Sequence, residues 1–172
     1  MKSLKLLQRA KDIGKSVEDK QDEITVAEVW HLYKHLIMRY KVLETTKTLK
    51  NYVKFSDFKV VIRIGIKGLQ EQVDLIENLM NEYGIPLPER PPVDFRSVSI
   101  LEIITDRYIF RRIFRGIQFF IPFHASAYIQ STTPKLREFF KKMLIEEISI
   151  YDKFVEYGKT RGFEYVPPIY KK

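Results

Sequence analysis

Carboxylates and histidines at helical spacing are the residues of this sequence that could bind a metal ion. Glu28 and His31 form the one Glu-x-x-His pair in the chain, and two helices of a carboxylate-bridged dimetal bundle each supply such a pair. His35 follows one helical turn after His31, so a helix through this stretch places all three side chains on one face. Such a face can form a weak zinc site, but it is more often a plain polar surface.

The apolar residues of the same stretch predict that this face points away from the core. On a helical wheel with Val29 as reference, His31 lies at about 200° and Glu28 at about 260°. We therefore expect Glu28, His31 and His35 to form an exposed polar patch, with a surface zinc site as the less favoured alternative. The apolar side chains that cluster near Val29 are Tyr33, Leu36, Tyr40 and Leu43.

Two further carboxylates, Glu44 and Glu147, fall within about 40° of the apolar centres of their helices. A buried carboxylate must be paired, protonated or bound to a metal. A structural polar network is favoured here over a relict single-metal site shared by the two glutamates. His124 is expected about 15 Å away along the bundle, as a hydrogen-bonded boundary residue. The third-helix side chains that could partner the glutamates are Arg107, Arg111, Arg115 and Gln118.

The second helical pattern argues against a complete dimetal centre. Its core stripe contains no carboxylate or imidazole, and Glu71 and Asp74 point away from it. The chain also lacks cysteine, a Gly-rich phosphate loop and a Gly-x-Ser-x-Gly motif. We therefore assign no catalytic, cofactor-binding or metal residue, expect no cofactor, and favour a protein that is not an enzyme. The stripe consists of Phe58, Ile62, Leu69, Val73, Ile76 and Met80.

Four long helices must position these residues, and start and stop signals mark their ends. Capping boxes, polar caps and a first-turn proline start the helices, glycines end them, and Pro122 should kink the third. The expected helices span about residues 25–54, 57–83, 99–128 and 134–157. The start signals are Thr25 with Glu28, Ser56 or Asp57, Ser99 with Glu102, and Thr133 with Pro134; the stop signals are Gly84 and Gly158.

The two halves of the chain resemble each other. Tyr83 and Gly84 match Tyr157 and Gly158, and each pair precedes a proline-bearing stretch. The stretch after Gly84 is long enough to run the whole length of a helix. The sequence therefore predicts an all-α, ferritin-like four-helix bundle built from two helical hairpins joined by a long proline-rich crossover. The bundle should cover residues 24–160, with a mixed-charge N-terminal extension (1–23) and an extended C-terminal tail (161–172).

Composition and charge limit the classes of partner that we expect this protein to bind. The 172 residues are 45% hydrophobic and carry a formal net charge of +8. The basic residues of 31–70 are dispersed along helices, which does not favour nucleic-acid binding. No apolar run reaches the roughly 20 residues that span a bilayer, so we expect no membrane segment and a cytoplasmic protein.

Four short motifs lie at residues 25–30, 83–88, 137–140 and 166–170. They are similar to those of the ferritin-like, spore coat protein F-like family from spore-forming Firmicutes. The resemblance covers most of the chain, and its motifs are structural rather than catalytic. It implies a ferritin-like bundle and a spore-associated role, but no established activity and no functional residues.

We expect a non-enzymatic helical bundle that acts by protein association, with a homodimer and spore coat proteins as the candidate partners. Phe119, Phe120 and Phe123 cover more than one face of the third helix, which is typical of central burial or of a dimer interface. The alternative is a degenerate ferritin-like metal binder that uses Glu44 and Glu147.

Overall fold

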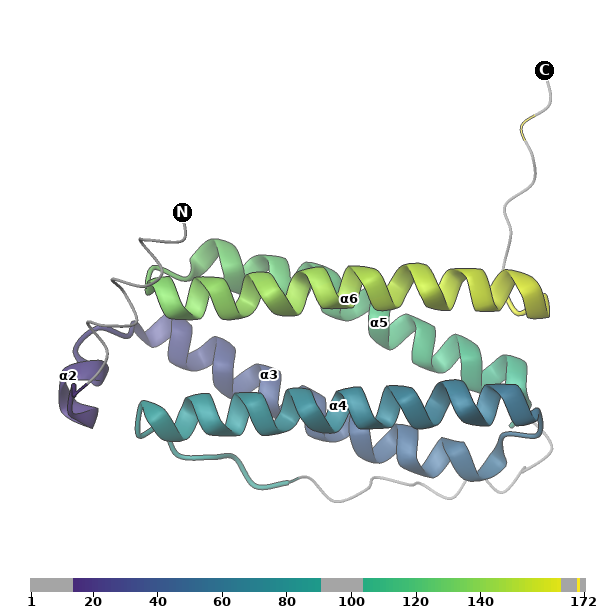
Figure 1. Ribbon diagram of the computed structural model, residues 1–172, viewed down its shortest axis with the longest axis horizontal. Coiled ribbons are helices and arrows are strands. Elements are labelled where there is room, and N and C mark those ends of the chain that lie inside the picture. The colour runs from purple at the N-terminus through teal and green to yellow at the C-terminus, as the bar shows by residue number, and fades with distance from the viewer. Residues whose placement is uncertain (1–13, 91–103, 165–169, 171–172) are drawn as a thin grey trace.

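Four long helices make up the bundle (Figure 1). The computed structural model describes residues 14–90, 104–164 and 170. Within these ranges the chain forms helices and no strand, and no helix is long and apolar enough to cross a membrane. The elements are α2 (Val17–Gln21), α3 (Val26–Leu49), η1 (Lys50–Tyr52), α4 (Ser56–Glu82), α5 (Asp106–Gln130) and α6 (Pro134–Arg161).

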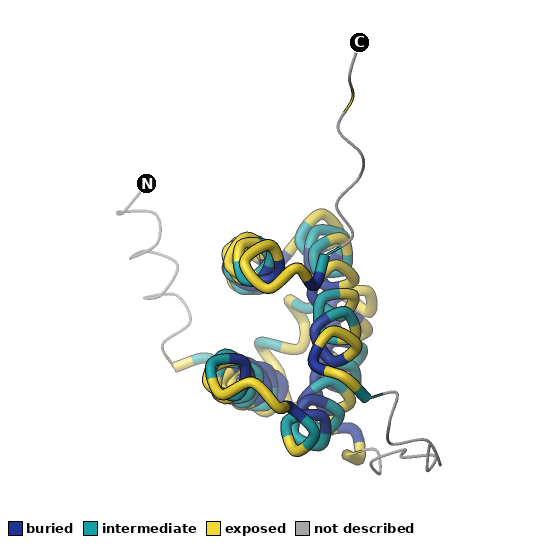
Figure 2. Tube along the Cα trace, turned by 90° about the vertical axis from the view of Figure 1, so that its right-hand side faces the viewer, coloured by how far each residue is buried: buried dark blue, intermediate teal, exposed yellow. Residues whose placement is uncertain are grey.

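The helices pair as two antiparallel hairpins, α3 with α4 and α5 with α6, as predicted (Figures 1 and 2). Contacts at both ends join α4 to α6: Phe58 stacks on Tyr157 with 5.5 Å between ring centroids, and Glu82 pairs with Lys135. The carboxylate of Asp106 binds the loop just before α4, so α5 begins at the opposite end of α4 from Glu82. The end of the first hairpin and the start of the second therefore lie at opposite ends of α4, which is about 40 Å long for 27 residues.

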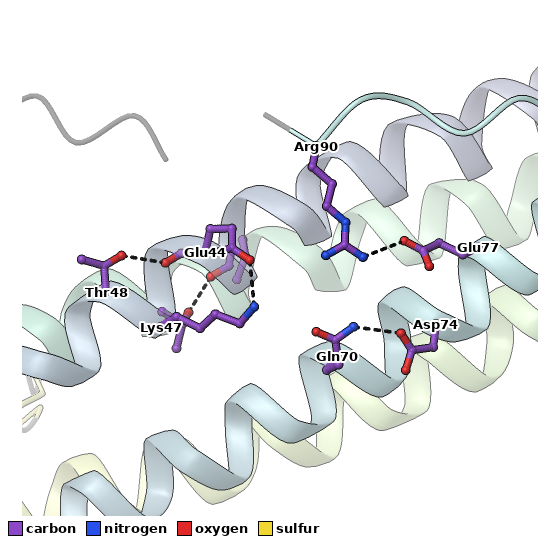
Figure 3. Close-up of polar contacts among 9 residues, drawn as sticks. Glu44, Lys47, Thr48, Gln70, Asp74, Glu77 and Arg90 are labelled. Atoms are coloured by element: carbon purple, nitrogen blue, oxygen red, sulfur yellow. Dashed lines mark hydrogen bonds and ion pairs between the residues drawn. The ribbon is translucent and has the colours of Figure 1, made fainter. Parts of the chain in front are cut away.

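The described start of this crossover is fastened to the first hairpin. Arg90 pairs with Glu77 of α4 at 3.2 Å (Figure 3) and lies over the ring of Tyr40, 4.9 Å from its centroid. Tyr40 also donates a hydrogen bond to Glu77, and burial together with this bond raises the pKa of Tyr40 to about 12. At the same end of α4, Gln21 of α2 donates to the backbone oxygen of Tyr83 at 2.9 Å.

Two carboxylates at helix starts hold the loop of the opposite hairpin. Glu28, in the first turn of α3, accepts the backbone N–H groups of residues 132–133 at 2.9 and 2.7 Å. Asp106, in the first turn of α5, accepts those of residues 54–55 at 2.8 and 2.7 Å. These reciprocal contacts satisfy loop N–H groups that would otherwise be left without partners. Each hairpin therefore holds the loop of the other through a carboxylate in the first turn of its first helix.

The helix starts follow the sequence signals in two cases and depart from them in two. The Thr25–Glu28 capping box and the start at Thr133–Pro134 are confirmed. The predicted cap at Ser56 or Asp57 is wrong, because Phe55 is the N-cap residue and the Asp57 carboxylate instead binds Arg161 and Tyr157 of α6. The third helix begins at Asp106, capped by Thr105; Ser99 and Glu102 lie outside the described residues.

The predicted stop at Gly84 is confirmed, but the stop at Gly158 is wrong. Gly84 and Gly162 both have φ of 62° and close their helices in the left-handed conformation that glycine adopts without strain. Gly158 is buried inside α6, where a Cβ atom would collide with the ring of Phe110. Its role is close packing rather than chain reversal.

The apolar core is divided into two clusters along the bundle axis. One cluster contains Leu36 of α3, Ala127 of α5 and Met143 of α6, and the other lies nearer the C-terminal ends of α3 and α6 and the N-terminal end of α5. His124 of α5 and Glu147 of α6 lie between them, and the side chain of Arg39 on α3 reaches both; all three are buried. The second cluster is formed by Leu49, Val53, Phe58, Ile62, Ile109, Phe110, Ile117, Phe154 and Phe163.

Candidate functional site

A buried ion pair lies at the centre of the polar layer between the two clusters. Arg39 of α3 donates from Nη2 to Oε2 of Glu147 on α6 at 2.5 Å, and both side chains are only 2% exposed. The same Nη2 lies 2.9 Å from Nε2 of His124 on α5. The Arg39 guanidinium also lies 3.7 Å from the ring centroid of Phe120, a cation–π contact. One cation on α3 therefore contacts three side chains of two other helices, two from α5 and one from α6.

Two histidines extend this layer as a directed hydrogen-bond chain. Arginine can only donate, so His124 accepts on Nε2 and carries its proton on Nδ1. His124 Nδ1 lies 3.1 Å from His35 Nε2, and His35 Nδ1 lies 2.6 Å from the backbone oxygen of His31. The assignment that satisfies all three contacts gives both imidazoles one proton, on Nδ1. The chain then ends at a carbonyl oxygen, which accepts the last hydrogen.

Burial keeps both imidazoles neutral. It lowers the pKa of His35 well below the ordinary value of 6.5, and the neighbouring His124 and Arg39 lower it further. Burial also lowers the pKa of His124, although the Glu147 carboxylate opposes the shift. For Glu147, burial raises the pKa, but the Arg39 guanidinium that donates to its carboxylate opposes this effect and the net pKa is lowered. The layer thus contains one positive charge, one negative charge and two neutral rings.

The prediction that Glu28, His31 and His35 point to solvent is wrong. Their exposed fractions are 0%, 6% and 0%. The helical wheel assumed one buried face, but α3 packs against α4 on one side and against α5 on another, so two of its faces are covered. The exposed face of α3 instead contains Val26, Trp30 and Tyr33.

Each of the three residues of that predicted patch has a different partner. Glu28 binds the loop between α5 and α6, His31 contacts Gln130 Oε1 at 3.0 Å, and His35 belongs to the histidine chain. His35 is also stacked on Phe123, with 4.1 Å between ring centroids. The three side chains therefore do not form a zinc site together.

The prediction of a buried, paired carboxylate is confirmed for Glu147 and wrong for Glu44. The Glu44 side chain is 28% exposed and pairs with Lys47 on its own helix at 2.8 Å (Figure 3). The two glutamates thus have separate partners, so they do not share a metal site.

The partner expected from the third helix is also wrong. Arg107 and Arg111 instead bind the backbone oxygens of Gly162 and Phe163. Arg39, which reasoning from the sequence missed, takes their role. The expected position of His124, about 15 Å away along the bundle, is also wrong, because its Nε2 lies 3.5 Å from Oε2 of Glu147. The signal that could have found it is the four-residue spacing of His31, His35 and Arg39, a polar line on one side of α3.

The donor set does not fit a carboxylate-bridged dimetal centre. Such a centre needs four carboxylates and two histidines from four helices. Here the layer offers one carboxylate, already bound to Arg39, and α4 contributes buried apolar side chains such as Val73 and Ile76. Among the residues that the structure describes, no group of three or more histidines, aspartates and glutamates could hold a metal ion.

Comparisons with known proteins agree with the fold. The family described as "Protein of unknown function (DUF3231)" matches residues 12–172. The crystal structure of a "putative spore coat protein" from Bacillus halodurans has a TM-score of 0.79 at 20% identity, covering 89% of this chain and 99% of that chain. No curated protein sequence matches the chain.

A second solved structure supports the same conclusion. It is a two-domain protein from Anabaena variabilis with DJ-1/ThiJ/PfpI-like and ferritin-like domains, and it has a TM-score of 0.65 at 18% identity. The match covers 93% of this chain and 42% of that chain. The predicted ferritin-like bundle is confirmed, and at these identities the likeness concerns the fold alone.

Removing one partner of the central ion pair should destabilise the protein far more than removing both. Arg39→Met or Glu147→Met leaves an unpaired buried charge, which should lower the free energy of unfolding by about 3–5 kcal/mol. The double variant removes both charges and should recover most of that loss. Urea unfolding of the wild type, the two single variants and the double variant measures the coupling free energy between the two side chains.

The exposed pair Lys67–Glu71 on α4, at 3.9 Å, is the matched control. Its coupling should stay below about 1 kcal/mol, because solvent screens exposed charges. Additive losses at Arg39 and Glu147 would contradict the assignment of a coupled buried pair.

Stability should fall as the pH drops from about 6.5 toward 5. The folded-state pKa values of His35 and His124 are lowered, so the unfolded chain takes up protons first in this window. Each histidine should contribute a slope of at most about 1.4 kcal/mol per pH unit. The lowered pKa of Glu147 makes stability depend on pH only below about 4.5, the ordinary pKa of this side chain.

The variant His35→Gln tests this window, because its amide oxygen can accept the His124 hydrogen bond without titrating. We expect a smaller loss of stability between pH 6.5 and 5 than in the wild type, measured by urea unfolding at each pH. An unchanged pH slope would show that His35 is not one of the groups that titrate on unfolding.

Proposed function

The chain belongs to the DUF3231 family of proteins of unknown function. For this member of the family we propose a ferritin-like bundle that acts by protein association rather than by catalysis. The proposal includes a homodimer and a role together with spore coat proteins.

The observation that carries the proposal is the position of Arg39. Ferritin-like metalloproteins place metal ions between carboxylates and histidines at the bundle centre. In this chain Nη2 of Arg39 contacts both the Glu147 carboxylate and the His124 ring, at 2.5 and 2.9 Å, and these two groups lie 3.5 Å from each other. The protein's own cation thus neutralises the one buried carboxylate of the layer. This arrangement stabilises the bundle but offers no open site for a substrate.

Because the described part of the chain contains no group of residues that could hold a metal ion, we place the function at the surface. The outward face of α3 exposes three large apolar side chains, Val26, Trp30 and Tyr33, which are 88%, 57% and 37% exposed. Their spacing of four and three residues places them on one face of the helix. Trp and Tyr are enriched among the residues that dominate binding energy at protein interfaces. This α3 stripe therefore supports association through α3.

The spore context is supported by likeness alone. The Bacillus halodurans protein, named a "putative spore coat protein", shares the fold over 89% of this chain. The sequence motifs described above are similar to those of spore coat protein F-like domains. Spore coat proteins are accordingly the partner class that we propose alongside self-association.

Replacing Trp30 with glutamate should weaken self-association at least tenfold, because it places a charge in the α3 stripe without touching the core. Sedimentation equilibrium over a range of protein concentrations measures the dimer dissociation constant. The control is Ile64→Glu on α4, where an apolar side chain that is 69% exposed receives the same charge.

The control variant should associate like the wild type. A wild-type protein that stays monomeric at high concentration would contradict the homodimer. Equal effects of Trp30→Glu and Ile64→Glu would show that charge alone, rather than the α3 stripe, controls association.

A further inference from the structure

A groove of about 330 Å³ runs between α3 and α5. Its volume falls at the lower end of the range for small-molecule sites, about 300–1,000 Å³. The side chains that form its floor are mostly apolar. They are Met38, Val42, Leu49, Ile113, Phe119 and Phe120.

Three cations border this α3–α5 groove: Lys41, Arg112 and Arg115. All three are exposed, and none has an ion-pair or hydrogen-bond partner within the described part of the chain. No aspartate or glutamate lines the groove. The groove therefore combines an apolar floor with a rim of one sign of charge, and that charge is not neutralised by the protein.

Gly116 keeps the floor of the groove open. It lies in the middle of α5, where glycine is less favourable than alanine by about 0.5–1 kcal/mol. A Cβ atom at this position would have no atom within 4 Å, so packing against the protein does not require the glycine. The missing side chain instead leaves space in the groove.

We propose that the α3–α5 groove binds a single-chain anionic amphiphile, namely a fatty acid, with its hydrocarbon chain on the apolar floor and its carboxylate at the cationic rim. Charge complementarity selects this occupant. A second copy of this chain placed symmetrically on the same groove would bring two sets of cations together, which is unfavourable. A small free anion would leave the apolar floor exposed to water. The inference is independent of the association proposed for the α3 stripe.

The test is titration of the full-length protein with dodecanoate by isothermal calorimetry, below the concentration at which dodecanoate forms micelles. Dodecanol and dodecyltrimethylammonium are the probes with a neutral and a cationic head. We expect saturable binding of one dodecanoate per chain, binding at least tenfold weaker for the other two probes, and weaker dodecanoate binding at high salt.

Two variants separate the floor from the rim. Gly116→Leu fills the groove and should weaken dodecanoate binding at least tenfold, without lowering the melting temperature. Its control is Gly65→Leu on α4, another helical glycine with open space around its Cβ position. Arg112→Glu/Arg115→Glu should have an effect of similar size. Its control, Arg63→Glu/Lys153→Glu, makes the same change of net charge outside the groove.

The proposal is overturned if dodecanoate does not bind, or if dodecanol binds as tightly as dodecanoate. It is also overturned if Gly116→Leu binds dodecanoate as tightly as the wild type does. If Gly116→Leu instead changes the mass of the protein in sedimentation, the groove is a protein interface rather than a fatty-acid site. Circular dichroism melting of each variant shows that a loss of binding does not come from unfolding.

Discussion

The ion pair between Arg39 and Glu147 is the interaction on which the arrangement of this bundle depends. Two opposite charges buried in a protein interior are costly to desolvate, and only close pairing with further hydrogen bonds offsets that cost. The pair joins α3 to α6, and the contacts of Arg39 with His124 and Phe120 bring in α5. Any shift of these three helices along one another would separate the charges. The polar layer thus fixes the register of three helices.

Carboxylates at the helix starts fix the ends of the bundle in a similar way. Glu28 and Asp106 each accept two backbone N–H groups from the loop of the opposite hairpin. Both carboxylates lie in the first turn of the first helix of their hairpin. In the structure, Gly84 corresponds to Gly162 rather than to Gly158, because both close a helix in the left-handed conformation.

The sequence predicted the fold more fully than the site, for physical reasons. An amphipathic helix with one buried stripe, such as α4, can be read from its periodicity, and Phe58, Val73 and Met80 are buried as expected. A helix that is covered on two sides cannot be read in this way. The periodicity of α3 therefore did not predict that His35 and Arg39 are buried. The burial of Glu147 could be predicted from its own helix. Its partner could not, because that choice depends on how the helices lie against one another.

An internal cation that neutralises the central carboxylate leaves this ferritin-like bundle without a vacant dimetal donor set. The measurement that tests this claim most directly is elemental analysis of protein purified without chelators and then incubated with ferrous, manganous or zinc ions. The account predicts much less than one metal ion per chain under every condition. One or two tightly bound ions per chain, lost when Glu147 is replaced, would contradict it and would show that Arg39 moves aside for a metal.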